Sequence, residues 1–412
     1  MRRELLQDSR FRRVISAAAL LIGGFGIVYL FRKSIVADWS DVDFIYIWLS
    51  GHLWSQGISP YGVEFIEQGS ILFDIFNGQA FFYPPSFWFI SRIFTSFEYQ
   101  TAVEVWRWTS VSLLLLSSLL LKAGMGNAGI KISWPTIIFY TGLVSFMQGT
   151  VLTFVLGQTS IVIYFAVCLV IYSALSRNNI LLAVGLCLVL LKPNVGAGLF
   201  IAFLPFAIYR KSVVLTVFGS LLMSLPALLP FGVINTILSY LTGISEHSGY
   251  IANQAQLTTG IRNIFYHLTD IEMSSTLAVL ITVLGILMTM IVIAKTSILM
   301  KEGQENEKIL FILALSLSMI GFLAPLHVYD FMFVAPVILL TQKLGKYTQV
   351  VIFVSFLVIA RSQNITFEAG IFRPHYPNLW AGSELSTMAS FFNTVLIFVV
   401  AKNLYMRHAE NT

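Results

Sequence analysis

The sequence predicts an all-α polytopic membrane protein with about twelve transmembrane helices, and three observations support this fold class. Hydrophobic residues make up 57% of the 412 positions and charged residues only 11%, whereas a soluble domain carries about 25% charged residues. Apolar runs suited to crossing a bilayer recur along the whole chain. Lys and Arg are also distributed unequally between alternate connections, as in membrane proteins.

The predicted spans follow one another from the first residues to the last. A bilayer core requires about 20 apolar residues in a helix. We interpret the first run as an uncleaved span, because no small-residue cleavage signal follows it. The fifth, tenth and eleventh runs are short enough to be half-helices or strongly tilted helices. The predicted spans are 14–31, 102–121, 133–150, 159–175, 180–191, 195–209, 213–231, 274–298, 309–325, 328–342, 347–360 and 385–401.

The charge distribution predicts the orientation of these spans. With the N-terminus in the cytoplasm, 17 of the 25 Lys and Arg residues fall in cytoplasmic segments and 14 of the 20 Asp and Glu residues fall outside. Cytoplasmic enrichment of positive residues is the normal pattern. We therefore expect a protein of the cytoplasmic (inner) membrane with both termini inside. Cys168 and Cys187 lie in apolar runs and predict neither a disulfide framework nor a metal site.

Three connections on the predicted outer side are long, at about 32–101, 232–273 and 361–384. The other connections are short, and no repeat or linker interrupts the chain. We therefore expect a single domain over residues 1–412. Loops held by a rigid scaffold often carry function, so any chemistry is expected at the outer face.

The first outer segment is predicted to contain amphipathic helices that lie at the membrane interface. Asp43 precedes the first of them, where a carboxylate can cap a helix and interact favourably with its dipole. Aromatic and apolar side chains then recur on one face, and such a helix lies along the membrane surface. The residues on that face are Phe44, Ile47, Trp48, Gly51 and Trp54.

Five short motifs in this order resemble those of glycosyltransferase family 87. Three positions depart from the family pattern and affect the expected sugar and acceptor: Ala255 replaces Ser, Leu326 replaces Trp, and Leu49-Ser50 replaces Ala-Ala. The motifs are Asp43-Phe44 with Tyr46, Gly57, Pro60-Tyr61 and Tyr83-Pro84-Pro85; Gly157-Gln158; Leu191-Lys192-Pro193; Asn253-Gln254 with Gly260 and Arg262; and the segment from Ser318 to Asp330.

The resemblance implies a GT-C fold and a hexosyltransferase activity. Such an enzyme moves a sugar, with mannose suggested by the family, from a polyprenyl-phosphate donor to a glycolipid or glycan acceptor at the extracytoplasmic face. The lipid-linked sugar is a co-substrate, so no cofactor is expected. The expected partners are this donor, the acceptor and membrane lipids. A net charge of +5 is too small to indicate nucleic acid.

The transfer chemistry requires a general base, because the acceptor hydroxyl loses its proton as it attacks the anomeric carbon. The resemblance assigns this role to Asp43, with Asp41 as the alternative; a purely capping role for Asp43 stays open. We expect a single inverting displacement, because no second carboxylate has an evident nucleophilic role. A divalent cation held by Asp38, Asp41 and Asp43 is the less favoured interpretation, since clustered aspartates often only face water.

The leaving phosphate requires fixed positive charge or hydrogen-bond donors. The expected donor-phosphate residues are Lys192, Arg262 and His327. Each has a simpler alternative: Lys192 extending to the headgroups, Arg262 as a solvated loop charge, and His327 as a structural residue. The expected substrate-binding residues are Asp41, Tyr61, Tyr83, Gln158, Asn253 and Gln254.

Two other functions remain open from the sequence. A transporter or flippase of lipid-linked sugars would explain the short, interrupted spans, although such proteins usually contain repeats. An O-antigen polymerase or ligase also handles lipid-linked glycans at the outer face. Those enzymes typically have Arg-rich outer loops, whereas segment 232–273 contains only Arg262.

Overall fold

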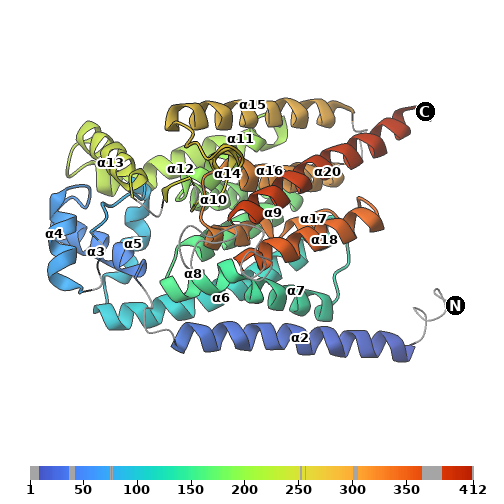
Figure 1. The fold of residues 1–412 in the computed structure, drawn as a ribbon, viewed down its shortest axis with the longest axis horizontal. Helices are drawn as coiled ribbons and strands as arrows, with labels where there is room; N and C mark the ends of the chain where they lie inside the picture. The colour runs from blue at the N-terminus through green and yellow to red at the C-terminus, as the bar shows by residue number, and fades with distance from the viewer. Residues whose placement is uncertain are drawn as a thin grey trace.

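The computed structural model shows a helical protein in which no strand occurs among the described residues. Most helices run along the long axis of the molecule and form one bundle, while α3, α4 and α5 cluster at one end of it (Figure 1). The structure describes residues 9–36, 42–74, 76, 78–250, 253–255, 257–299, 305–363 and 383–410.

Six helices in the described part of the chain are long and apolar enough to cross a membrane. A seventh span results if α7 (Trp134–Phe146) and α8 (Gln148–Leu156), which are bent by 65° relative to each other, are counted together. The six long helices are α2 (Ser9–Val36), α6 (Tyr99–Asn127), α12 (Arg210–Leu228), α15 (Ser275–Leu299), α16 (Glu305–Leu323) and α20 (Ser383–Glu410).

Shorter helices fill the remaining predicted apolar segments. Helix positions therefore agree with the sequence prediction, whereas a count of twelve spans stays a prediction. These helices are α9 (Ser160–Leu175), α10 (Asn179–Val189), α11 (Pro193–Phe203), the 3-10 helix η4 (Val328–Val334), α17 (Val337–Leu340) and α18 (Lys346–Ala360). α9 is buried along almost its whole length, so its first residues are fixed firmly inside the bundle.

The first outer segment folds into α3 (Phe44–Ser55), α4 (Val63–Leu72) and α5 (Trp88–Phe94). The prediction that α3 is an amphipathic surface helix is wrong. Ile45, Leu49 and Leu53, outside the predicted apolar face, are also fully buried. α3 is apolar on several sides and packs against α4, α5 and α6, so it forms the core of a small helical cluster rather than one wall of it.

The turn that follows α3 depends on a glycine. Gly57 adopts φ +73°, which glycine reaches without steric cost. Further along, Pro84 is extended, with φ −65° and ψ 159°, before the short helix η1 (Pro85–Phe87). Pro84 therefore keeps the chain extended just before η1, and Pro85 is the first residue of that helix.

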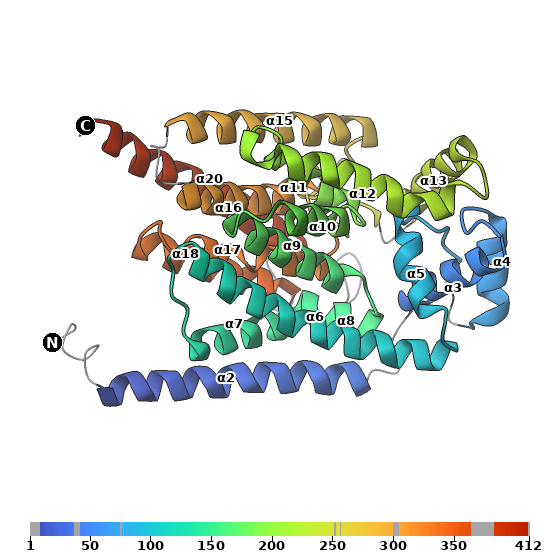
Figure 2. The same ribbon diagram turned by 180° about the vertical axis from the view of Figure 1, so that it is seen from behind.

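The second outer segment contains two helices, α13 (Val233–Ser248) and α14 (Ile261–Thr269). α13 lies at the same end of the molecule as α3, α4 and α5 in both views (Figures 1 and 2). The first turn of α2 and the last turn of α20 lie at the opposite end (Figure 1). The third predicted outer segment, 361–384, falls almost entirely outside the described residues.

Candidate active site

A cavity of about 310 Å³ lies where the α8–α9 turn, the α10–α11 turn, α13, η4 and the segment before α14 meet. Its lining comes from parts of the chain that are far apart in sequence. Six of the ten predicted site residues line it, namely Tyr83, Gln158, Lys192, Asn253, Arg262 and His327. The cavity is therefore the candidate active site.

Gln158 connects this cavity to the first outer segment. Gly157 ends α8 in the left-handed conformation, with φ +69°, so the chain turns sharply before α9 begins. The Nε2 of Gln158 then donates a hydrogen bond to Oδ2 of Asp43 at 2.5 Å. The backbone N–H of Asp43 also donates to the carbonyl of Leu156 at 2.9 Å. Both contacts hold Asp43 beside the α8–α9 turn.

Asp43 occupies the N-cap position of α3, yet its side chain makes no capping hydrogen bond. A purely capping role is therefore wrong. Burial raises the pKa of this carboxyl from 3.8 to about 6, while Gln158 and Lys192 lower it and Asp330 raises it. A pKa near the working pH suits a general base. Asp41, the alternative base, lies outside the described residues.

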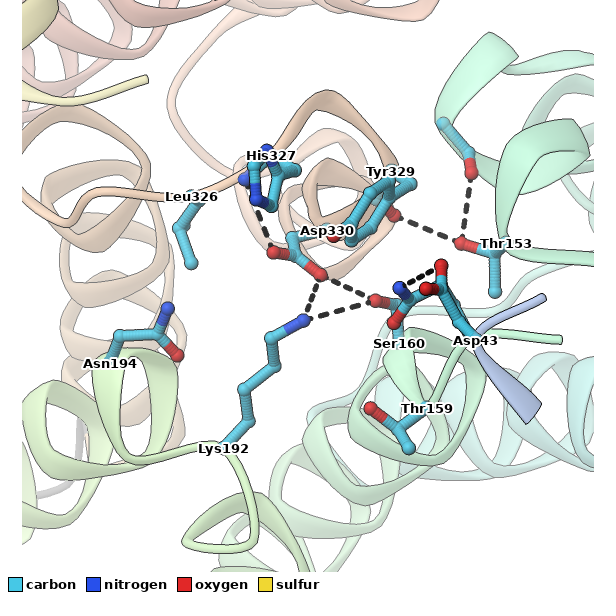
Figure 3. A network of polar contacts seen from close by, with 12 residues as sticks. Asp43, Thr153, Thr159, Ser160, Lys192, Asn194, Leu326, His327, Tyr329 and Asp330 are labelled. Atoms are coloured by element: carbon cyan, nitrogen blue, oxygen red, sulfur yellow. Dashed lines mark hydrogen bonds and ion pairs between the residues drawn. The ribbon is translucent and has the colours of Figure 1, made fainter. Parts of the chain in front are cut away.

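Lys192 lies between α10 and α11, where Pro193 starts the second helix. Its ammonium forms an ion pair with Asp330 and lies 3.4 Å from the hydroxyl of Ser160. Figure 3 shows the side chain extending inward toward these two groups. The ammonium also lies 5.4 Å from the centre of the Tyr329 ring. The alternative that Lys192 extends to the headgroups is therefore wrong.

Asp330 is the anionic centre of this network. One carboxylate oxygen pairs with Lys192 and accepts a hydrogen bond from Ser160. The other accepts the backbone N–H of His327 at 3.2 Å. Asp330 and His327 therefore form a capping box at the start of η4, in which the Asp330 carboxylate accepts from the His327 backbone and the His327 side chain accepts from the Asp330 backbone. From the sequence, Asp330 is only the last residue of the motif from Ser318 to Asp330, and its contact with Lys192 is not predicted.

His327 is a neutral hydrogen-bonding residue at the cavity wall. Its Nε2 lies 2.9 Å from Oδ1 of Asn253, a pairing in which the imidazole N–H donates. Burial lowers the pKa of His327 to about 4, so the ring is uncharged at neutral pH. A neutral imidazole has a single N–H donor, so His327 can donate to a phosphate oxygen only if that oxygen replaces Asn253 as the acceptor.

His247 is a cavity residue that sequence reasoning missed. It belongs to α13, its backbone carbonyl accepts from Nδ2 of Asn253 at 2.6 Å, and its ring stacks on Phe82 at 3.6 Å. Burial lowers its pKa to about 3. No motif surrounds His247. The only sequence signal for a place at the cavity is that aromatic and polar residues share its face of the helix.

Arg262 also lines the cavity, near the start of α14. One of its terminal nitrogens pairs with Glu272 at 2.8 Å, and the side chain is 17% exposed. Its Nε is buried without a hydrogen-bond partner among the described residues. The alternative of a solvated loop charge is therefore wrong, because most of the guanidinium is enclosed next to the cavity.

Three described site residues that the sequence predicts do not line the cavity, namely Asp43, Tyr61 and Gln254, although Asp43 contacts the lining residue Gln158. The hydroxyl of Tyr61 donates to the backbone carbonyl of Tyr83 at 2.8 Å, so Tyr61 supports the wall from behind. Gln254 is also absent from the lining, although its backbone carbonyl accepts from Leu257 and Thr258 in the adjoining turn.

Two cations and two neutral imidazoles line one cavity, and a carboxylate of near-neutral pKa, Asp43, is hydrogen-bonded to the lining residue Gln158. Such a set can accept a proton from a hydroxyl and stabilise an anionic leaving group. Among the described residues, no three His, Cys, Asp or Glu side chains lie close enough together to hold a metal ion.

The comparison with protein families adds an independent finding. The model of glycosyltransferase family 87 matches residues 81–325. Asp41, Asp43, Tyr61 and His327 lie outside the matched region. The predicted site residues inside it are Tyr83, Gln158, Lys192, Asn253, Gln254 and Arg262. No curated protein matches the chain.

Proposed function

Because the chain belongs to glycosyltransferase family 87, we propose that this membrane glycosyltransferase moves a sugar from a polyprenyl-phosphate donor to a lipid or glycan acceptor. The resemblance favours mannose and a hexosyltransferase activity. The convergence of Lys192, Arg262 and His327 on one cavity, with Asp43 hydrogen-bonded to the cavity residue Gln158, is the observation that carries the proposal.

In the proposed reaction, the acceptor oxygen attacks the anomeric carbon of the donor sugar while Asp43 accepts its proton. The bond between that carbon and the phosphate oxygen breaks, and the phosphate leaves with the electron pair. A single displacement of this kind inverts the anomeric centre. Gln158 donates to one oxygen of Asp43, which orients the carboxylate and leaves lone pairs for the acceptor proton.

The leaving phosphate is proposed to bind Lys192, Arg262 and His327. Both cations are paired with carboxylates, Asp330 and Glu272, in the ligand-free protein. An incoming phosphate therefore shares these two cations with the carboxylates that already pair with them. The buried Nε of Arg262 adds an N–H donor that suits a phosphate oxygen, and the N–H of His327 becomes available when the phosphate displaces Asn253 from it.

The arrangement of the helix ends supports the proposed side of the membrane. α3, α4, α5 and α13 lie at the end opposite to the first turn of α2 and the last turn of α20 (Figures 1 and 2). Together with the distribution of Lys and Arg, this supports cytoplasmic termini and an extracytoplasmic active site in the cytoplasmic membrane.

The test compares two matched variants in membranes supplied with radiolabelled polyprenyl-phosphate sugars. Asp43→Asn removes the proposed base, and Asp74→Asn makes the same change at an exposed position of the same outer segment. We expect transfer by the wild type and by Asp74→Asn, and at least about a hundredfold loss in Asp43→Asn.

Each other outcome has a defined meaning. Equal transfer by Asp43→Asn would remove Asp43 from the mechanism and make Asp41 the next candidate. Movement of the lipid-linked sugar across the bilayer without donor consumption would favour a flippase, and growth of a lipid-linked polymer would favour a polymerase. A panel of donor hexoses identifies the sugar, and the anomeric configuration of the product shows whether transfer inverts.

A further inference from the structure

α13 has three faces with different surroundings. One face turns inward: Thr236 is buried, and Tyr240 and His247 line the cavity. Gly243 lies on this face so close to the carbonyl oxygen of Phe81 that a β-carbon would collide with it. The inward face is therefore packed tightly against the segment that precedes η1.

The second face of α13 is an exposed apolar stripe. Its residues recur at helical spacing, and the largest exposed fractions are 73% for Ile234 and 58% for Leu238. Polar residues such as Asn235, Thr242 and Glu246 occupy the third face. The apolar stripe consists of Val233, Ile234, Ile237, Leu238, Leu241 and Ile244.

The stripe continues the lipid-facing surface of a span candidate. α12 is long and apolar enough to cross a membrane and also exposes large apolar side chains, among them Phe218, Leu221 and Leu225. Only residues 229–232 separate it from α13, and Leu229 in this connection is 67% exposed. Because the hydrocarbon covers α12, the same leaflet is the occupant that best fits the stripe on α13.

Ile244 belongs to both the stripe and the cavity. It is 38% exposed and lines the cavity together with Tyr240 and His247. The lipid-facing surface and the cavity therefore meet at this residue. A ligand that remains in the membrane by its lipid chain can reach the cavity along this edge without leaving the leaflet.

We propose that α13 lies in the outer leaflet, with its apolar stripe in lipid, and that lipid-linked substrate enters the cavity sideways past Ile244. The position of α13 depends only on its apolar stripe and its connection to α12. The entry route also depends on the proposed glycosyltransferase function, so the two parts are tested separately.

The first experiment measures the depth of α13 without relying on activity. Spin labels are attached to Ile234→Cys and Leu238→Cys, with Asn235→Cys and Glu246→Cys as controls on the polar face, in vesicles of phosphatidylethanolamine and phosphatidylglycerol. Cys168 and Cys187 are buried, so labelled wild type provides the blank. We expect oxygen to relax the stripe labels more strongly than a water-soluble nickel complex does, and the reverse at the controls.

Either of two results would overturn the position of α13. Stripe labels that respond to the nickel complex as strongly as the controls would place the stripe in water. Spin–spin broadening between the labels of two molecules, with no access to oxygen, would show that a second copy of the chain covers the stripe.

The second experiment tests the entry route by kinetics. Leu238→Glu places a carboxylate in the stripe, and Asn235→Glu places one on the polar face as the matched control. For a long-chain polyprenyl donor we expect Leu238→Glu to raise KM about tenfold, a change of about 1.4 kcal/mol, with kcat little changed. For a short, water-soluble prenyl donor, both variants should match the wild type.

Equal increases in KM for the long and short donors would refute entry past α13, because the effect would not depend on the lipid chain. If the wild type transfers no sugar from any donor, the proposed function fails. The spin-label result still decides the position of α13 in that case.

Discussion

Replacing Gln158 by Leu separates two roles that this residue can have. As a positioning residue, Gln158 stabilises the ionised form of Asp43 through its hydrogen bond. As a residue that only binds the sugar, it would affect transfer equally at every pH. The variant keeps a side chain of similar size, so the shape of the α8–α9 turn is largely retained.

The expected change follows from the electrostatics of Asp43. Its pKa is about 6 in the presence of the hydrogen bond. A hydrogen bond to a charged group contributes about 1.5–3 kcal/mol, and one pKa unit corresponds to about 1.4 kcal/mol. Gln158→Leu should therefore raise the pKa by about one to two units, to roughly 7.5.

A raised pKa removes the active base most strongly on the acid side. At pH 6.5, about three quarters of Asp43 is deprotonated when its pKa is about 6. Only about one tenth is deprotonated when the pKa is about 7.5, so the rate should fall about eightfold. At about pH 9 Asp43 is ionised in both proteins, so the rates should converge.

The assay is the pH dependence of kcat/KM, measured with a labelled polyprenyl-phosphate sugar and the variant reconstituted in vesicles. Gln100→Leu, a change of the same kind at an exposed position of α6, serves as the control and should follow the wild-type profile. A rate loss in Gln158→Leu that is the same at every pH would refute the positioning role.

Two other variants test the energetics of the site. Asp43→Asn should stabilise the fold at neutral pH while it abolishes transfer. The pKa of Asp43 in the folded protein is about 6, above the ordinary 3.8. Above about pH 6 the buried carboxylate therefore destabilises the folded protein by an amount on the order of 3 kcal/mol, which Asn removes. Denaturation midpoints should therefore differ at pH 7.5 and agree near pH 4, and equal midpoints at both would contradict the assignment. Lys192→Met leaves the Asp330 carboxylate buried without its cation and should lose about 3–5 kcal/mol. Adding Asp330→Asn should recover most of the stability but not the binding of labelled donor; recovery of binding would exclude Lys192 from the phosphate site.

Local sequence patterns predicted most of the helices, because a run of apolar residues in a membrane must satisfy its backbone hydrogen bonds within a helix. The pattern failed for α3. The predicted stripe placed Phe44 and Trp48 on one face, but Ile45 and Leu49 made the opposite face apolar as well. The helical cluster that covers α3 depends on tertiary packing, which the periodicity of a single segment does not encode.

The site was predictable as a set of residues but not as a set of contacts. Motifs identified Asp43, Gln158 and Lys192 separately. Gln158 and its partner Asp43 are 115 positions apart in the sequence, and Lys192 and its partner Asp330 are 138 positions apart. Such pairings arise when α9, η4 and the α10–α11 turn pack together. His247 was missed for the same reason, because only the packing of α13 brings it to the cavity.

The ion pair between Lys192 and Asp330 has a consequence for turnover under the proposed function. The donor is a phosphodiester with one negative charge, whereas the product phosphomonoester carries about 1.5 to 2 negative charges at pH 7. Unpaired cations would therefore hold the product more tightly than the donor. A carboxylate that competes for Lys192 after each transfer offsets this difference. Asp330 would then limit product inhibition. It would weaken the binding of the donor but speed the release of the lipid phosphate product.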